Sequence, residues 1–437
     1  MDATLRVRGA VETSDGVTRA ELAAELGLPL GTVTTAVAGL LRSGALAERA
    51  APAPAGAQGR AGRPAMILVP AGRQRVAGTV IWTHGLLRVA AATYGGTILA
   101  RRETAVGEDA LGLELLEPAW RFLEENGNGL EKNGDGPLDR VVLGVAAPFQ
   151  RGVGLPPGRL PAPRRAGPGP NLVASDPARP DMTRPDTADA GGRARRPGFA
   201  PWLQLDPAAE LSTRLGVPVV VENDANLGAL GEAHYGAGRG HRSQIYLKLG
   251  ERSVGSGLIL DGALYRGASG FAGEIAHIHV DDQGPLCPCG ARGCLSAQAR
   301  LPLLELMENA YDRPLTFAEV LRMADADDPG PARVLRELGR ALGRPLADLC
   351  TFLNPGLLVL DATLGGAGRH VLSGIADQVE RYCAPAVAAG LSLTHGALGP
   401  DAEILGAVHL ARTEALAAVP PPSAPLLSAP LTPSSSA

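Results

Sequence analysis

The sequence is poor in lysine. Among its 437 residues, lysine stands only at positions 132 and 248, so arginine supplies almost all of the positive charge. The formal net charge is −4. This balance excludes a global positive field around the chain, and any contact with nucleic acid must come from a local basic surface.

Long apolar runs are missing as well. No run approaches the roughly 20 residues of a membrane span, and Met1 is not followed by the charged and then apolar segments of a signal peptide. We therefore expect a cytoplasmic protein without membrane contact. Cysteine is scarce, and three of the five cysteines lie together at 287, 289 and 294. In a reducing compartment such clustering favours a metal site over disulfides.

The length and a hydrophobic content of 45% allow more than one buried core. We expect a small helical domain at 1–72, an α/β domain at 73–415 and a disordered tail at 416–437. Residues 156–198 are rich in Pro, Arg, Gly and Asp and lack apolar periodicity, which predicts a disordered surface insertion. Its arginines either contact DNA or belong to a plain solvated loop.

The first segment has the pattern of two short helices joined by a tight turn. Thr18 followed by Glu21 is a capping box, and Gly27 ends the first helix. The spacing of Ala23, Gly27 and Val33 is typical of a helix-turn-helix, with a small residue where the helices cross, a Gly in the turn and an apolar anchor on the second helix. The second helix, at about 31–43, exposes the side chains that we expect near bases or phosphates in the major groove: Thr32, Thr34 and Thr35.

Two short strands are expected next, at 45–49 and 65–69, around a tip rich in Gly, Pro and Arg. They predict the wing of a winged helix, with Arg60 and Arg63 against phosphate or the minor groove. A plain helical hairpin with a flexible linker is the alternative. From Val76 onward, β runs alternate with helical periodicity, which indicates an α/β domain.

The segment "VPVVVENDANLGALGE" places Glu222, Asn223 and Asp224 at the carboxyl end of an apolar strand, just before a helix. Open α/β sheets bind ligands at such strand ends. A carboxylate beside an amide can bind sugar hydroxyls, and in an enzyme Asp224 could take a hydroxyl proton. An Asx turn that caps the helix explains the same residues equally well.

Four residues have the spacing H-x9-C-x-C-x4-C: His277, Cys287, Cys289 and Cys294. Three thiolates and one imidazole fill a tetrahedral Zn²⁺ shell with no open position, which favours a structural site. A reduced loop without metal is the alternative. Spacing also leaves His279 open as the fourth ligand in place of His277.

Together these features resemble the ROK family of repressors, open reading frames and sugar kinases, in the winged-helix branch of xylose and N-acetylglucosamine repressors. The likeness spans about 18–410 apart from the insertion. Besides the helix-turn-helix, it rests on "GRPA", "PVVVENDAN", "GLILDGALYRGASGFAGEIAH", "CPCGARGC" and "LNPGLLVLDATLGGAG". The resemblance implies a winged helix-turn-helix head followed by an actin-like (ribonuclease-H-like ATPase), two-lobed sugar-kinase fold.

The resemblance also assigns roles to residues of the α/β domain. It implies that Asn223, Asp224 and Glu274 bind sugar hydroxyls, and that His277 contacts both sugar and zinc. The three clustered cysteines complete the zinc shell. Where the family has Leu-Glu after the last zinc cysteine, this chain has Leu295-Ser296, so one carboxylate acceptor for the sugar is missing.

Both phosphate loops of the family's kinases are altered. The Asp-x-Gly-x-Thr loop corresponds to Ile81, Thr83 and Gly85, without an Asp to help hold Mg²⁺, and Gly-Thr-Gly-Ile-Gly corresponds to 251–255, which reads ERSVG. Phosphoryl transfer depends on metal and amide electrostatics. We therefore expect no kinase activity, with Asp224 as a vestigial base.

The sequence predicts a sugar-responsive transcriptional regulator, with a repressor as the first expectation. Its partners would be operator DNA and a sugar or sugar derivative, and its form a homodimer or a dimer of dimers. Two alternatives remain: a sugar kinase that retains a DNA-binding head, and a DNA-binding protein whose sensor domain no longer responds.

Overall fold

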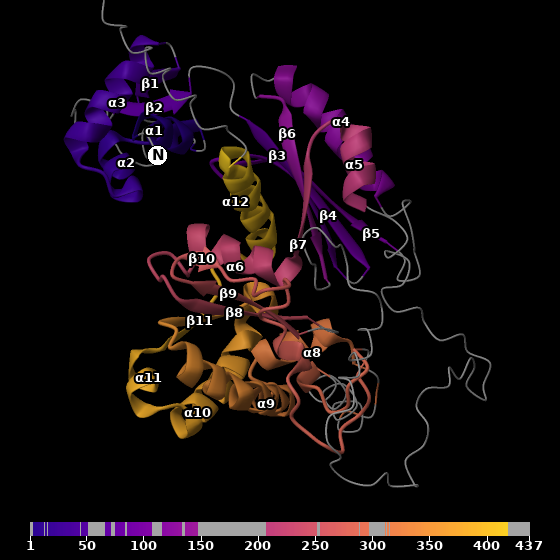
Figure 1. Cartoon of the computed structure of the whole chain (residues 1–437). Helices are drawn as coiled ribbons and strands as arrows, with labels where there is room; N and C mark the ends of the chain where they lie inside the picture. Colours follow the sequence, from indigo (N-terminus) through magenta and orange to yellow (C-terminus); the bar gives the residue numbers. More distant parts are fainter. Residues whose placement is uncertain are drawn as a thin grey trace, which may run out of the picture.

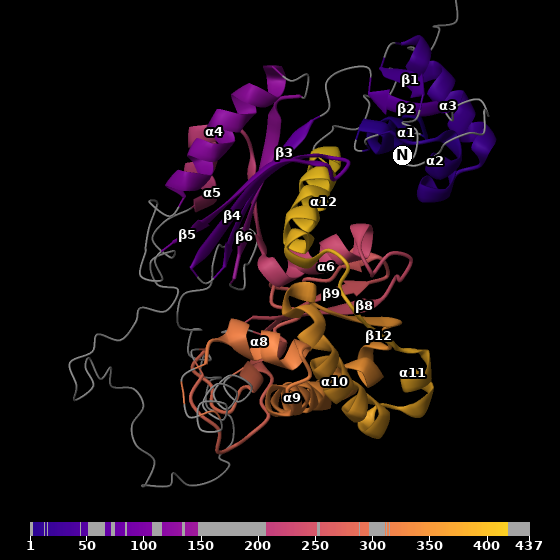
Figure 2. The same ribbon diagram turned by 180° about the vertical axis from the view of Figure 1, so that it is seen from behind.

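The computed structural model (Figures 1 and 2) describes the residues to which all statements below refer. They are 3–12, 14, 16–43, 45–50, 66–70, 75–83, 85–106, 116–132, 136–146, 207–250, 254–287, 289–296, 311, 313 and 315–417. The insertion expected at 156–198 and most of the expected tail lie outside these ranges.

The head consists of three helices and a two-stranded antiparallel sheet, the arrangement of a winged helix-turn-helix. Its elements are α1 (Ala3–Glu12), α2 (Arg19–Leu26), α3 (Leu30–Arg42), β1 (Leu46–Ala50) and β2 (Met66–Pro70). The expected helices and wing strands are present within about one residue of their predicted limits. Helix α1 was not predicted; its Val7 and Val11 are fully buried in the head core.

The turn between α2 and α3 forms for the reasons that the sequence indicates. The Thr18 hydroxyl accepts a hydrogen bond from the Glu21 amide at 3.2 Å, and Glu21 accepts one from the Thr18 amide at 2.8 Å. Gly27 adopts φ 61°, the left-handed conformation that ends α2 without steric cost. Leu22, Val33 and Val37 then fill the space between the helices.

The body contains two five-stranded sheets with the same topology. The first has the order β5-β4-β3-β6-β7, and the second has the order β10-β9-β8-β11-β12. In each sheet the first three strands along the chain are antiparallel, and the last two run parallel to the central strand. This repeat is the two-lobed, actin-like sugar-kinase fold that the family resemblance implied.

Helices α4 (Glu117–Lys132) and α5 (Pro207–Leu215) cover the outer face of the first sheet. Helices α8 (Phe317–Asp325), α9 (Pro329–Leu353), α10 (Gly368–Tyr382) and α11 (Pro385–Gly390) cover the outer face of the second. The strands are β3 (Val76–Thr83), β4 (Leu86–Thr93), β5 (Ile98–Ala105), β6 (Leu138–Val145), β7 (Val219–Asn223), β8 (Gln244–Leu249), β9 (Val254–Leu260), β10 (Ala263–Leu264), β11 (Leu357–Leu360) and β12 (Ser392–His395).

Helices α6 (Asp224–Tyr235) and α12 (Ala402–Ala417) lie between the two sheets, as Figures 1 and 2 show. Their backbones approach closely, because a Cβ atom on Gly231 would lie 1.9 Å from the Ala402 carbonyl oxygen and one on Gly406 would lie 1.8 Å from that of Leu227. The last turn of α12 extends to Ala417, two residues into the segment expected to be a tail.

Within the described residues, no single helix has both the length and the apolar character needed to cross a bilayer. Helices α2 and α3 satisfy that test only as a pair, and their axes are bent by 119° relative to each other.

Candidate functional site

The candidate ligand site begins where β7 ends and α6 starts. Asn223 caps α6, since its side-chain oxygen accepts a hydrogen bond from the Asn226 amide at 3.1 Å. Glu222 is buried and accepts hydrogen bonds from the Asn223 amide and the Asn226 side chain, both at 3.0 Å, and it pairs with Arg266 at 2.7 Å. The cap that the sequence left as an alternative is therefore present, and it fixes the start of α6.

Asp224 is the first residue of α6, and only 7% of it is exposed. One of its carboxylate oxygens accepts a hydrogen bond from the Ala225 amide at 2.9 Å. The other lies 2.5 Å from Nζ of Lys248, which belongs to strand β8 of the second sheet. Sequence reasoning missed this contact, although the rarity of lysine in the chain was a signal.

Lys248 also pairs with Glu403 in the first turn of α12, and Arg88 of β4 pairs with the same carboxylate. Burial alone would lower the pKa of Lys248, but the adjacent Asp224 and Glu403 carboxylates outweigh it and raise that pKa. The ammonium is therefore held charged between two buried carboxylates. These four side chains, Arg88, Asp224, Lys248 and Glu403, are called the interlobe ion cluster below.

Glu274 lies in the loop that leads into the 3-10 turn Ile275–His277. Burial, together with the charge of Asp224, raises its pKa to about 7. A carboxyl group with this pKa can donate as well as accept a hydrogen bond near neutral pH. Its Oε2 lies 3.9 Å from Nε2 of His277. The structure thus brings Asp224, Glu274 and His277, three of the residues predicted to contact sugar, toward one region.

The four residues predicted to bind zinc converge. The ligand atoms of His277, Cys287, Cys289 and Cys294 all lie within 4.8 Å of one another. Nδ1 of His277 is 3.5 Å from Sγ of Cys287, and the sulfurs of Cys289 and Cys294 are 3.6 Å apart. A tetrahedral zinc shell has ligand edges of about 3.5–3.8 Å. The donor set and its spacing fit such an ion.

Two neighbours of this cluster resolve points that spacing left open. His279 is not part of the group, and its Nε2 lies 3.3 Å from a carboxylate oxygen of Asp282. Ser296, which stands where the family has a sugar-binding Glu, places its hydroxyl 3.9 Å from Sγ of Cys287. Burial opposes ionisation of the Cys287 thiol, but hydrogen bonds with Cys289, Cys294 and Ser296 lower its pKa.

The two segments expected to replace the kinase phosphate loops lie partly within the described residues. Ile81 is fully buried in the core between the sheets and offers no carboxylate. Thr83 ends β3, and Gly85 adopts φ 83° in the turn before β4. In the second loop, Val254 and Gly255 open β9, whereas 251–253 lie outside the described residues.

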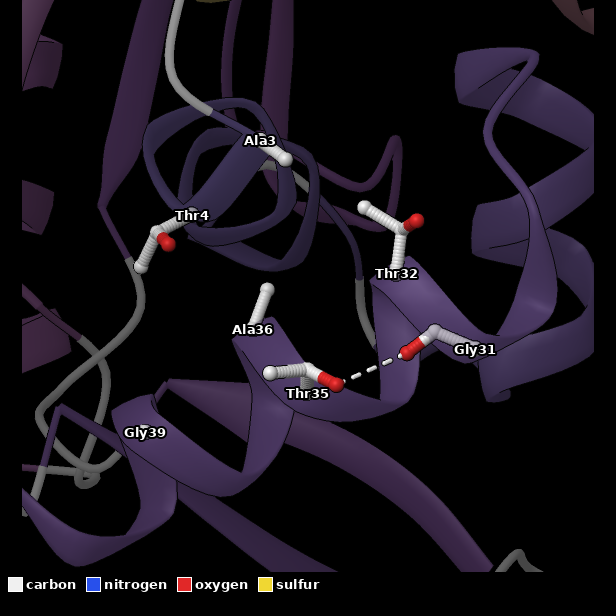
Figure 3. A pocket seen from close by; sticks show the side chains of 7 residues that line it. All are labelled: Ala3, Thr4, Gly31, Thr32, Thr35, Ala36 and Gly39. Atoms are coloured by element: carbon white, nitrogen blue, oxygen red, sulfur yellow. Dashed lines mark hydrogen bonds between the residues drawn. The ribbon is translucent and has the colours of Figure 1, made fainter.

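In the head, the threonines expected to contact DNA are exposed on α3. The hydroxyls of Thr34 and Thr35 donate to the carbonyl oxygens four residues earlier, at 2.8 and 3.0 Å, so in this conformation their hydroxyl hydrogens are taken up by the backbone of α3. Thr32 and Thr35 also line a cavity of about 450 Å³ between α1 and α3, opposite Ala3 and Thr4 (Figure 3). Arg60 and Arg63 of the expected wing tip lie outside the described residues.

Comparison with known proteins agrees with this architecture. A sequence model described as the ROK family matches residues 196–414. The xylose repressor of Bacillus spizizenii is 31% identical over 205 residues, which cover 47% of this chain and 53% of the repressor. The glucokinase of Streptomyces coelicolor is 34% identical over 243 residues, which cover 49% of this chain and 74% of the kinase. The chain thus spans about half the length of the xylose repressor that it matches.

Among solved structures, a ROK family transcriptional regulator described as a homologue of the E. coli MLC protein superposes with a TM-score of 0.67. That match covers 95% of this chain and 96% of the regulator at 18% identity, and it concerns the fold alone. A ROK family glucokinase from Streptomyces griseus, solved with glucose and AMPPNP, gives a TM-score of 0.53 at 24% identity and covers 77% of this chain and 99% of the kinase. Relatives of this chain thus include both repressors and kinases. The chain belongs to the ROK family.

Proposed function

We propose that the protein is a sugar-responsive, DNA-binding transcriptional regulator, and that it acts as a repressor without kinase activity. Residues 1–72 would be the DNA-binding domain, and 73–415 would be the sensor. The observation that carries the proposal is the pairing of Asp224 with Lys248 in a chain whose described head residues form three helices and a two-stranded sheet. The xylose repressors among the relatives support a regulatory role.

The pairing matters because Asp224 occupies the position of the family's catalytic base. A base must accept a proton from the substrate hydroxyl. Here one carboxylate oxygen is bound to an amide and the other to a buried ammonium. Both oxygens therefore already have partners, and a sugar hydroxyl would add a further hydrogen bond to the group without finding an oxygen free to take its proton.

The sugar site would comprise Asn223, Asp224, Glu274 and His277. Its mixture of a carboxylate, a carboxyl with a pKa near neutrality and an imidazole offers both donors and acceptors. Sugars present both as well, since each hydroxyl donates and accepts. The position of Ser296 beside Cys287 means that hydroxyl recognition would depend on these residues without the family's additional Glu.

The metal would be zinc, held by His277, Cys287, Cys289 and Cys294. Three thiolates and one imidazole complete a tetrahedral shell, so the ion would have a structural role and leave no position for substrate. When bound, it would fix the loop that carries Glu274 and His277. Ser296 would orient the Cys287 sulfur through its hydroxyl.

DNA recognition would use α3 in the major groove, with Thr32, Thr34 and Thr35 near bases or phosphates, and Arg60 and Arg63 of the wing near phosphate or the minor groove. A homodimer, or a dimer of dimers, would present two heads to a pseudo-palindromic operator.

The proposal is tested by selecting duplex DNA from a random pool with the full-length protein, followed by quantitative binding to the selected sequence. We expect a pseudo-palindromic duplex bound much more tightly than a scrambled one. Failure to enrich any sequence would overturn the proposed function.

A sugar kinase with a DNA-binding head is the second candidate, because the glucokinase match covers 74% of that enzyme and Asp224 is retained. ATP, Mg²⁺ and a panel of hexoses distinguish the two. We expect no phosphorylation above that of an Asp224→Asn variant, whereas sustained turnover would favour the kinase.

A further inference from the structure

The interlobe ion cluster does more than occupy Asp224, because each of its members comes from a different element. Asp224 begins α6, Lys248 belongs to β8 of the second sheet, Glu403 lies in the first turn of α12, and Arg88 belongs to β4 of the first sheet. Arg88 also donates to the carbonyl oxygen of Pro400 at 2.7 Å. The start of α12 is therefore tied to the candidate ligand site by charge.

All four members of this cluster are buried or nearly so: the side chains of Lys248 and Arg88 are 12% and 10% exposed, and those of Asp224 and Glu403 are 9% and 5% exposed. Charges at such depth are weakly screened, and a change at one of them alters the energy of the others. A ligand that competes for the Asp224 oxygen paired with Lys248 must therefore disturb Lys248. Through Lys248 it must also disturb Glu403.

Helix α12 can transmit that disturbance because it is one continuous element packed closely against α6. It is continuous from Ala402 to Ala417, and glycines bring its backbone against α6 at two points. His409 of α12 also stacks on His234 of α6, with ring centroids 3.5 Å apart and planes within 12°. From Glu403 to Arg412 the helix rises by about 13–14 Å, so Arg412 lies about two and a half turns along α12 from Glu403.

The carboxyl-terminal half of α12 contacts the head. Arg412 of α12 donates to Glu25 of α2 at 3.0 Å, across 387 residues of sequence. Figures 1 and 2 show the carboxyl-terminal half of α12 directed toward the head. Arg412 is largely covered, with 22% of its side chain exposed, and Glu25 is about half exposed. Helix α2 packs, as does α1, against α3, the expected recognition helix.

We infer that Lys248 and α12 connect the ligand site to the head, with Lys248 as the residue that senses occupation of Asp224 and the Arg412–Glu25 pair as the contact that reaches α2. This inference rests on the proposed function, because it takes Asp224 as part of the effector site. It adds a positioning residue, Lys248, that motif comparison does not provide, and it assigns α12 a role in coupling.

Physical connection alone does not demonstrate coupling, so the test must measure an effect at a distance. The experiment is hydrogen–deuterium exchange on the full-length protein, without sugar or DNA, read on the amides of α2 (Arg19–Leu26). The variants are Lys248→Met, Arg412→Gln and the double variant. Arg214→Gln, which removes an exposed ion pair with Glu210 on α5, is the matched control.

We expect Lys248→Met and Arg412→Gln each to speed exchange in α2 by at least about threefold, with the double variant no faster than Arg412→Gln alone. Arg214→Gln leaves α2 unchanged. If Lys248→Met prevents folding, Glu403→Gln and the conservative Lys248→Arg replace it. Glu403→Gln should speed exchange in α2, and Lys248→Arg should keep it at the wild-type rate.

Unchanged exchange in α2 in a folded Lys248 or Glu403 variant would overturn the inference, as would fully additive effects of Lys248→Met and Arg412→Gln. Because this readout uses neither DNA nor sugar, it tests the connection through Lys248 and α12 even if the protein binds no duplex. Absence of DNA binding would instead reject the proposed function.

Discussion

Nζ of Lys248 lies 2.5 Å from a carboxylate oxygen of Asp224. In a chain with two lysines, one of them thus holds the carboxylate that a kinase of this family would use as its base. Lysine suits this position because its compact ammonium can serve two carboxylates at once on a flexible stem. Under the proposed function, this pairing would let a sugar-kinase fold keep a carboxylate for sugar binding without a free catalytic base.

Replacement of Lys248 by methionine should destabilise the protein strongly. It leaves the buried carboxylates of Asp224 and Glu403 without their shared cation, a change that costs about 3–5 kcal/mol when one partner of a buried pair is removed. The unfolding midpoint in urea measures the effect. Lys248→Met combined with Asp224→Asn should recover part of the loss, because Glu403 keeps Arg88 as a partner whereas Asp224 has lost its cation. A single variant as stable as the wild type would contradict the burial and charge assigned to the cluster.

The proposed metal site predicts different consequences for two nearby histidines. His277→Ala should reduce bound zinc and lower the thermal midpoint, because it removes one of four converging ligands. His279→Ala should retain the metal, since that ring pairs with Asp282. Elemental analysis of freshly purified protein provides the measurement. Loss of metal from the His279 variant alone would show that the ligands were assigned wrongly.

Acidification should weaken the contact between α6 and α12. Burial, aided by His234 and Arg412, lowers the pKa of His409 well below its usual 6.5. The folded protein therefore binds this proton less readily than the unfolded chain, so the associated stability is complete above about pH 6.5 and is lost as the pH falls. Because the stacked rings are partly exposed, we expect a loss of about 1 kcal/mol or less at pH 5.

The measurement for that prediction is the thermal midpoint at pH 7 and pH 5. His409→Phe should lose less stability between the two values than the wild type does, because phenylalanine retains a ring for stacking and cannot be protonated. His241→Gln, at an exposed position, serves as the control. Equal pH dependence in the His409 variant and the wild type would contradict the assignment of this loss of stability to His409.

The exposed face of α3 predicts an electrostatic effect on DNA binding. Thr35→Glu adds a negative charge beside the expected phosphate path and should weaken binding to the selected duplex at least about tenfold. Thr213→Glu is a matched control, because Thr213 is also exposed and also donates to a carbonyl oxygen four residues earlier, at 2.8 Å. Equal affinities of the two variants would argue against α3 as the recognition helix.

The architecture could be predicted from the sequence because its signals are local. The capping box at Thr18, the αL glycine at position 27 and the apolar strand before Asn223 each specify their own structure within a few residues. The metal cluster was predictable for the same reason, since its three cysteines lie within one loop. Helix α1 escaped prediction because its mean hydropathy is low and its burial depends on contacts with the rest of the head.

The interlobe ion cluster could not be predicted, because its members are far apart in the chain. Arg88 and Glu403 are separated by 315 residues, and Lys248 is 155 residues from Glu403. No short motif marks such a group, and only the stacking of two sheets around α6 and α12 brings it together. The choice between His277 and His279 also required coordinates, since both spacings are compatible with a metal shell.

The most direct test of the central claim is the affinity of the full-length protein for its selected duplex, measured by fluorescence anisotropy while pentoses, hexoses and N-acetylhexosamines are titrated in turn. The account predicts that at least one sugar changes the dissociation constant by about 5- to 150-fold, the range typical of allosteric coupling. A dissociation constant that stays the same at saturating concentrations of every sugar would contradict it.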